Sequence, residues 1–99
     1  MALRVLAELN ARDLLPVVRD VCRRHGVTVE EVCGTLRTRS IVRARREAWW
    51  HLRHHPERHY SVGDVSRIFG RPASTIDEGI RDHACRLAAT TDTPKVSRD

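Results

Sequence analysis

The sequence predicts a small all-helical domain of five or six helices that contains a helix-turn-helix. Three observations favour this fold class. Apolar residues recur at helical spacings of three and four along the 99-residue chain. No segment alternates apolar and polar residues for long enough to form a strand, and glycine and proline are sparse, at five and four residues. A chain of this length fits one domain, which we place at 13–90, after a short leader at 1–12 and before a disordered tail at 91–99.

The N-terminal part of the chain predicts one firm helix. Residues 1–10 are amphipathic but short, which favours a frayed leader or an extra turn. The first firm helix is expected over 13–25, with Asp13 as its N-cap. Pro16 fits there because the first turn of a helix does not use the missing N–H. Gly26 is expected to end this helix.

Two further helices are expected in the middle of the chain. A short helix starts at Thr28, because Thr28 and Glu31 have the spacing of a capping box. The next helix is expected over 41–55, where Ser40 can cap it and Pro56 stops it. Its inward stripe consists of Ile41, Ala44, Ala48 and Leu52, and one of the adjacent tryptophans, Trp49 and Trp50, completes the core.

The C-terminal half predicts a helix-turn-helix. A short helix starts after Ser61, with Asp64 at its third position, and Gly70 breaks it. A longer helix is expected over 72–89, since proline suits a first helical position. Its apolar stripe consists of Ile76, Ile80, Ala84 and Leu87. A short helix, a glycine-containing turn and a longer helix form the motif that many DNA-binding domains use.

Arginine dominates the charged residues. Lysine and arginine number 18 against 13 acidic residues, a formal net charge of +5, and Lys95 is the only lysine. Guanidinium groups that lie close together repel one another, and a phosphate backbone supplies the neutralising charge. The alternative is a solvated helical face whose arginines pair with distant acids. Five arginines fall close together with no acid between them: Arg37, Arg39, Arg43, Arg45 and Arg46.

Several other classes of protein are disfavoured. No segment has the length of a membrane span and no apolar run follows the start, so we expect a cytoplasmic protein. Cys22, Cys33 and Cys85 have no close pairing, which favours reduced, buried thiols. His51 and His55 have metal-ligand spacing, but histidines at a helix end more often interact with its negative pole. No catalytic motif is present, so we expect no enzyme, metal or cofactor site.

Three segments resemble the C-terminal DNA-binding domain of the bacterial replication initiator DnaA. The stretch from Leu36 to Ala48 looks like the basic loop and following helix of that domain. Val18 to Val32 is similar to its opening pair of helices, and Ser61 to Ile76 is similar to its helix-turn-helix. The resemblance covers about residues 13–89. It implies a free-standing domain of the Trp-repressor-like superfamily that binds double-stranded DNA.

The resemblance also implies roles for individual residues. Arg37 matches the arginine that enters the minor groove, and Arg45 and Arg46 match positions at which the family grips the DNA backbone. Ser74 and Thr75 match two threonines of the recognition helix, which enters the major groove. The candidate DNA-binding residues are therefore Arg37, Arg39, Arg43, Arg45, Arg46, Arg71, Ser74, Thr75 and Arg81.

One departure from the family affects specificity. The family has Asp-His just before these threonines, and both read bases. This chain has Pro72 and Ala73 there, whose side chains cannot hydrogen-bond a base, and Asp77 and Glu78 add negative charge nearby. We therefore expect DNA binding in replication initiation control or transcription regulation, without discrimination of the family's usual site, the DnaA box. The alternative is a protein-interaction module, derived from a helix-turn-helix, that docks on a replication initiator or on a phage or transposon protein.

Overall fold

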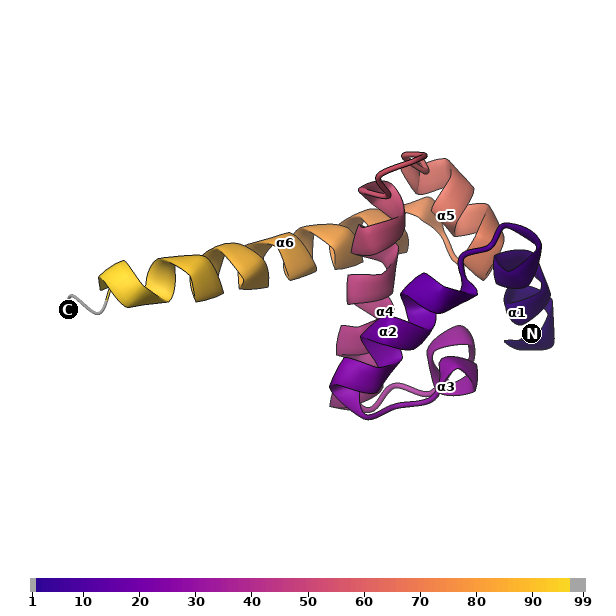
Figure 1. Ribbon diagram of the computed structural model, residues 1–99, viewed down its shortest axis with the longest axis horizontal. Helices are drawn as coiled ribbons and strands as arrows, with labels where there is room; N and C mark the ends of the chain where they lie inside the picture. Colours follow the sequence, from indigo (N-terminus) through magenta and orange to yellow (C-terminus); the bar gives the residue numbers. More distant parts are fainter. Residues whose placement is uncertain (1, 97–99) are drawn as a thin grey trace.

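The computed structural model describes the backbone of residues 2–96 and the side chains of residues 2–89. This part of the chain forms six helices and no strand, which confirms the predicted all-helical class (Figure 1). None of these helices is both long enough and apolar enough to cross a membrane. The helices are α1 (Ala2–Ala11), α2 (Leu15–His25), α3 (Val29–Cys33), α4 (Arg39–Arg53), α5 (Val62–Phe69) and α6 (Ala73–Val96).

Local capping signals fix three helix ends where the sequence predicts them. The hydroxyls of Thr28 and Ser61 each accept a hydrogen bond from the backbone N–H three residues later, at 3.0 Å in both cases. In return, the Glu31 and Asp64 carboxylates accept from the backbone N–H of the capping residue. Gly26 ends α2 in the left-handed conformation, with φ of 69°. Each cap satisfies N–H or C=O groups that the helix leaves unpaired.

Two other predicted N-caps are wrong, because a neighbouring residue takes the cap position. α2 begins after Leu14, while Asp13 adopts φ of 59° in the tight link from α1. α4 begins after Thr38, so Ser40 lies inside its first turn. No side chain caps the first turn of either helix. Both helices therefore begin without the side-chain cap that the sequence predicts.

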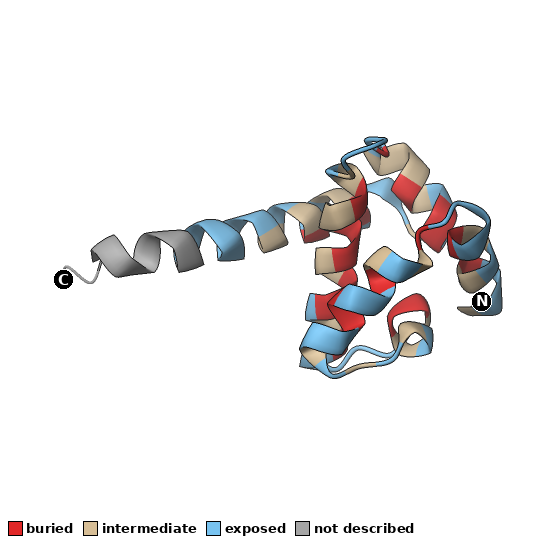
Figure 2. Ribbon diagram, in the orientation of Figure 1, coloured by how far each residue is buried: buried red, intermediate tan, exposed pale blue. Residues whose placement is uncertain are grey.

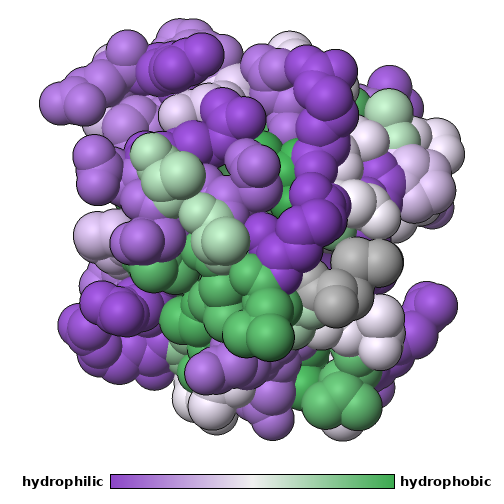
Figure 3. Space-filling model, turned by 90° about the vertical axis from the view of Figure 1, so that its right-hand side faces the viewer, coloured by the Kyte–Doolittle hydropathy of each residue, from purple (hydrophilic) through white to green (hydrophobic). Residues whose placement is uncertain are grey.

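The expected N-terminal leader is part of the core. Val5 and Leu9 of α1 are fully buried, and α1 contacts α2, α3 and α5. A helix of ten residues is marginal by itself in water, so the packing of its apolar face stabilises α1 and corrects the expectation of a frayed segment. The opposite face of α1 is at the surface, where Leu3 is 81 % exposed. Figure 3 shows this side of the molecule, with apolar surface between hydrophilic regions.

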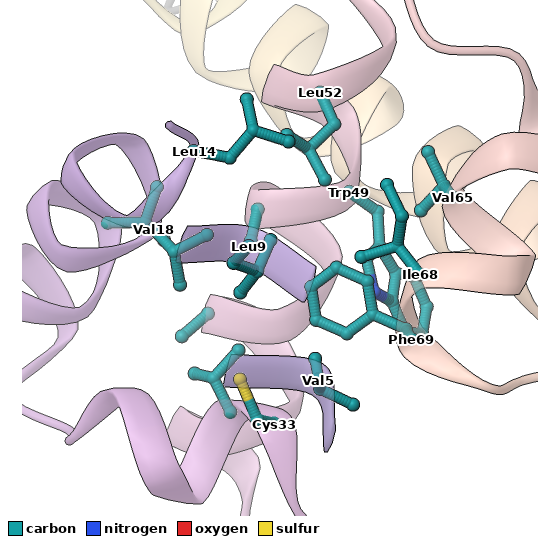
Figure 4. Close-up of a cluster of buried hydrophobic side chains, with 14 of the residues drawn as sticks. Val5, Leu9, Leu14, Val18, Cys33, Trp49, Leu52, Val65, Ile68 and Phe69 are labelled. Atoms are coloured by element: carbon teal, nitrogen blue, oxygen red, sulfur yellow. The ribbon is translucent and has the colours of Figure 1, made fainter. Parts of the chain in front are cut away.

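The core lies where α4 and α5 meet the N-terminal helices. Trp49 and Phe69 meet edge to face, with ring centroids 6.0 Å apart. Leu9 and Leu52 are fully buried in the same cluster (Figure 4). Trp50 is only half-buried, as expected for adjacent residues that point about 100° apart on one helix. Buried residues occupy the inner faces of the helices around this cluster (Figure 2).

Only the first turns of α6 pack against this core. Ile76 is buried and Ile80 is partly buried, as predicted. Ala84 and Leu87, expected on the same apolar stripe, are exposed, and so is the thiol of Cys85. The stripe prediction is therefore wrong for its second half, because α6 extends beyond the core there (Figures 1 and 2), although Arg86 still lies beside α4.

The end of α6 also differs from expectation. Residues 91–96, expected to belong to a disordered tail, continue the helix to Val96. This extension includes Pro94, which has no backbone N–H and therefore removes one hydrogen bond of the helix. The remainder of the expected tail, residues 97–99, lies outside the described residues.

The crossing of α6 over α4 depends on Gly79. Gly79 is buried, and a Cβ atom at this position would lie 2.7 Å from two ring carbons of Trp49 and 3.0 Å from Cγ of Arg46. Cβ atoms do not approach other atoms as closely as 2.7 Å. The two helices can therefore cross at this distance only because residue 79 has no side chain.

We expect Gly79→Ala to destabilise the fold by about 1–3 kcal/mol, because the added methyl group must displace the Trp49 ring. Helix propensity alone predicts the opposite, a gain of about 1 kcal/mol. Gly63→Ala is the matched control, since a Cβ atom there meets its nearest neighbour at an ordinary 3.7 Å. Urea unfolding of both variants tests this prediction. Equal stabilisation by the two changes would show that α6 does not need the close crossing.

Candidate nucleic-acid interface

One face of α4 carries a row of arginines. Arg39, Arg43 and Arg46 stand at spacings of four and three residues, so their side chains share one side of the helix. With Arg37 of the preceding loop and Arg86 of α6, they line an open groove of about 500 Å³. Arg37, Arg39 and Arg43 are exposed and have no hydrogen-bond or ion-pair partner among the described residues. The groove therefore presents positive charge that the described part of the fold does not neutralise.

A second cavity extends this groove toward the start of α6. Its volume is about 220 Å³, and Arg37 and Arg46 line both spaces. The second cavity adds Arg71, from the turn between α5 and α6, and Thr75, from the first turn of α6. Glu78 is the one acidic residue in its lining. The basic surface therefore runs from the loop before α4 to the helix-turn-helix.

Arg45, expected at the DNA surface, is buried inside the fold. Its side chain is 3 % exposed. The Nε atom donates to the carbonyl of Val32 at 2.9 Å, and Nη2 lies 3.1, 3.0 and 2.9 Å from the carbonyl oxygens of Glu31, Gly34 and Leu36. These carbonyls belong to the end of α3 and the loop after it, where a helix leaves C=O groups unpaired. Arg45 therefore holds this loop in place, which corrects its expected role as a residue that grips the DNA backbone.

Arg71 joins the helix-turn-helix to the same loop. Its Nη2 donates to the carbonyl of Gly34, which also accepts from Arg45. Gly70 ends α5 with φ of 66°, and the chain reverses at this point. Burial lowers the pKa of Arg45 to about 10, and the nearby charges of Arg71 and Arg37 act in the same direction. Arg45 nevertheless remains protonated at neutral pH.

An ion-pair network joins the arginine face of α4 to α6. Nη1 of Arg46 lies 3.0 Å from Oδ2 of Asp82, and Nε of Arg86 lies 3.1 Å from the same oxygen. The hydrogen bond from Arg86, with the charge of Arg46, holds the pKa of Asp82 below its usual value. The Arg46 side chain remains 34 % exposed. Arg46 therefore lines both the groove and the second cavity, while the hydrogen bond from its Nη1 to Asp82 limits its movement.

The first turn of α6 presents small polar side chains at the surface. Ser74 and Thr75 are exposed and Ile76 is buried, which is the orientation that the sequence predicts. Arg81 follows Ser74 by seven residues and so lies on the same face of α6. Arg81 is 79 % exposed, but its guanidinium pairs with Asp77 at 3.0 Å. The positive charge on this face of α6 is therefore partly neutralised, unlike that on α4.

Helical spacing in the sequence indicates the observed positions of two residues, Arg45 and Arg86. Counting from Ile41, Arg45 follows at four positions and Leu52 at eleven, which places Arg45 on the inward stripe of α4. Arg86 was not predicted at the site, although it follows Thr75 by eleven positions and so shares its face of α6.

A polar cluster beside the groove joins α2 to α4. Glu47 accepts hydrogen bonds from His25 at 2.7 Å, from His51 at 3.2 Å and from Arg24. Burial opposes the charge of Glu47, but these three hydrogen bonds outweigh it and hold the pKa of Glu47 at about 2. Within the described residues, no group of three or more metal-ligating side chains is arranged to hold an ion. The cluster therefore serves as a polar clamp between the two helices.

Comparison of the chain with known protein families, with curated proteins and with solved structures finds no match in any of the three. Function is therefore inferred from the chemistry of the groove and from the sequence itself.

We expect Glu47→Gln to lower the free energy of unfolding by about 1–3 kcal/mol at neutral pH. Because the pKa of Glu47 in the folded state lies below its ordinary 4.5, its charge stabilises the fold above about pH 4.5, and this contribution is lost as the pH falls through about 2. The difference in stability between the variant and the parent should therefore shrink in acid. Glu57→Gln, which alters an exposed carboxylate, is the control. A difference for Glu47→Gln that stays constant down to about pH 2 would contradict the clamp.

We expect Arg45→Met to destabilise the fold by about 3 kcal/mol or more, because several carbonyl oxygens lose their donors. Arg43→Met removes the same kind of side chain from the exposed face of α4, and it should change stability by no more than about 0.5 kcal/mol. Urea unfolding followed by circular dichroism measures both effects. If the two variants are equally stable, the loop after α3 does not depend on Arg45.

Proposed function

We propose that the protein binds double-stranded DNA through the groove between α4 and α6. The observation that supports this most strongly is the exposed set of Arg37, Arg39 and Arg43, which has no acidic partner among the described residues. Duplex DNA carries one negative charge per about 1.7 Å of its axis, and arginines that neutralise it release bound counterions. A row of unpaired guanidinium groups beside the start of a helix suits such a partner.

Within this proposal, phosphate contacts and base contacts come from different elements. The arginine face of α4 contacts phosphates, which supply affinity and position the protein. Ser74 and Thr75 are exposed on the first turn of α6, the turn that contacts base edges in helix-turn-helix proteins. Arg37 lies at the edge of an adjacent minor groove, where it contacts a phosphate that borders the groove, and narrow A·T tracts attract arginine to this position. The resemblance to the DnaA domain implies the same division, and with it a cytoplasmic role in replication initiation control or transcription regulation.

A second candidate function is docking on another protein, such as a replication initiator or a phage or transposon protein. Three observations on α6 favour it. Pro72 and Ala73 offer no side-chain hydrogen bond to a base, Arg81 is paired with Asp77, and Glu78 places a carboxylate in the groove. The exposed arginines of α4 favour DNA, because a protein partner does not require unpaired cations spread along a helix.

We expect the double change Arg39→Ala, Arg43→Ala to weaken binding to all duplexes by a similar factor. The slope of log K against log salt should become less steep by about 0.9 for each phosphate contact that is lost. Fluorescence anisotropy of a labelled random-sequence duplex, measured over a salt series, gives both quantities. Both residues are exposed, so circular dichroism should show an unchanged fold.

The matched control is Arg19→Ala, Arg23→Ala, which removes the same charge from exposed positions on α2. We expect this control to bind duplex DNA nearly as well as the parent. If both double variants lose affinity equally, only net charge matters and the groove is not the interface. If the parent does not bind duplex DNA at low salt, docking on a protein becomes the better assignment.

A further inference from the structure

The cavity at the start of α6 concentrates positive charge. It is lined by Arg37, Arg45, Arg46 and Arg71, and by one carboxylate, that of Glu78. The four guanidinium groups belong to the loop before α4, to α4 itself and to the turn before α6. Three of them come from the basic stretch 37–46, and the fold adds Arg71 from a distant part of the chain.

Most N–H donors of the accessible arginines lack an acceptor in the described part of the fold. Arg37 has no hydrogen-bond partner there. Arg46 uses Nη1 for Asp82. Arg71 uses Nη2 for the carbonyl of Gly34. Since a guanidinium group carries five N–H donors, the cavity holds many donors and few acceptors.

The charges around the cavity also repel one another. Arg71 and Arg37 both disfavour the charge of buried Arg45, and so they lie within electrostatic reach of it. Glu78, which is exposed, offsets only part of this positive charge. An anion in the cavity is attracted by all of these arginines, and the partly enclosed site strengthens that attraction relative to open water.

The cavity is large enough for a phosphate group. Its volume is about 220 Å³, against about 30 Å³ for one water molecule in the liquid. It therefore has room for one tetrahedral oxyanion and a few waters. Guanidinium groups match the oxygen atoms of a phosphate group in geometry and charge.

We propose that this cavity binds a single phosphate group, held by Arg37, Arg46 and Arg71. The phosphate comes from one of two sources. It belongs to the backbone of a bound duplex, in which case the site rests on the proposed function and deepens it, or it belongs to a free phosphate-bearing molecule. In both cases the same side chains contact the same group.

Two substitutions test the phosphate site. Arg19 is exposed on α2 and lines neither the groove nor the cavity, so its loss removes the same charge and leaves the site intact. Glu78 lines the cavity at the start of α6 but not the neighbouring groove, and its negative charge opposes the binding of an anion there. Glu78→Gln therefore strengthens phosphate binding, which a variant that merely damages the fold does not do.

The experiment titrates the whole protein with inorganic phosphate at constant ionic strength. Trp49 forms part of the cavity wall and reports binding through its fluorescence. The background carries Trp50→Phe, so that Trp49 is the only tryptophan. We expect a saturable change, weakened about tenfold or more by Arg37→Ala, since a hydrogen bond to a charged group is lost. Glu78→Gln should tighten binding several-fold, and Arg19→Ala should leave it unchanged.

A duplex arm of the experiment separates the two sources of phosphate. If a saturating short duplex abolishes the response to inorganic phosphate, the cavity holds a backbone phosphate. If the duplex binds and the phosphate titration is unchanged, the cavity takes a free phosphate. A phosphate response without any duplex binding supports the site and removes the proposed DNA function. The absence of a saturable response, or equal weakening by Arg37→Ala and Arg19→Ala, overturns the site even where duplex binding is intact.

Discussion

The fold and the candidate interface both depend on a cation that is buried among backbone carbonyls. α3 has five residues, too few for a stable helix by itself, and its last carbonyls need donors. Arg45 supplies them from α4, and Arg71 donates to the same carbonyl of Gly34. Removing a guanidinium from water costs several kcal/mol, which charge-assisted hydrogen bonds of this kind offset. The loop that carries Arg37 is therefore held from two sides.

This buried cation divides α4 into two faces with different roles. Ile41, Arg45 and Leu52 lie on the inward face and hold the helix against the core and the loop. Arg39 and Arg43 lie on the outward face and keep their charge at the surface. Since consecutive residues on a helix point about 100° apart, a run of arginines cannot all face one partner. The basic segment 37–46 thus supplies one buried structural residue, Arg45, and a row of exposed arginines.

Local signals predicted much of the fold, and long-range contacts account for most of the errors. The capping boxes at Thr28 and Ser61 involve residues three positions apart, so the sequence displays them directly. The core position of α1 depends on packing against α3 and α5, which no local pattern reports. In the candidate site, the exposure of Ser74 was predictable. The spacing of Ile76 and Ile80 shows which face of α6 is buried, and Ser74 lies outside that face. The arginine run predicts one exposed cluster, but helical spacing from Ile41 places Arg45 on the inward face of α4.

Two contacts fix where the charges of the interface stand relative to one another. The hydrogen bonds of Arg45 hold the loop that carries Arg37. The close approach of Gly79 to the Trp49 ring fixes the position of α6 beside the arginine face of α4. A surface that is already ordered loses less entropy on binding than one that orders in the complex. Pro72 and Ala73 remove side-chain contacts with bases, so under the proposed function discrimination has to depend largely on the path of the phosphates. Arginines that stand on a fixed backbone can sense that path, because a duplex whose shape or stiffness does not fit must be deformed to meet them.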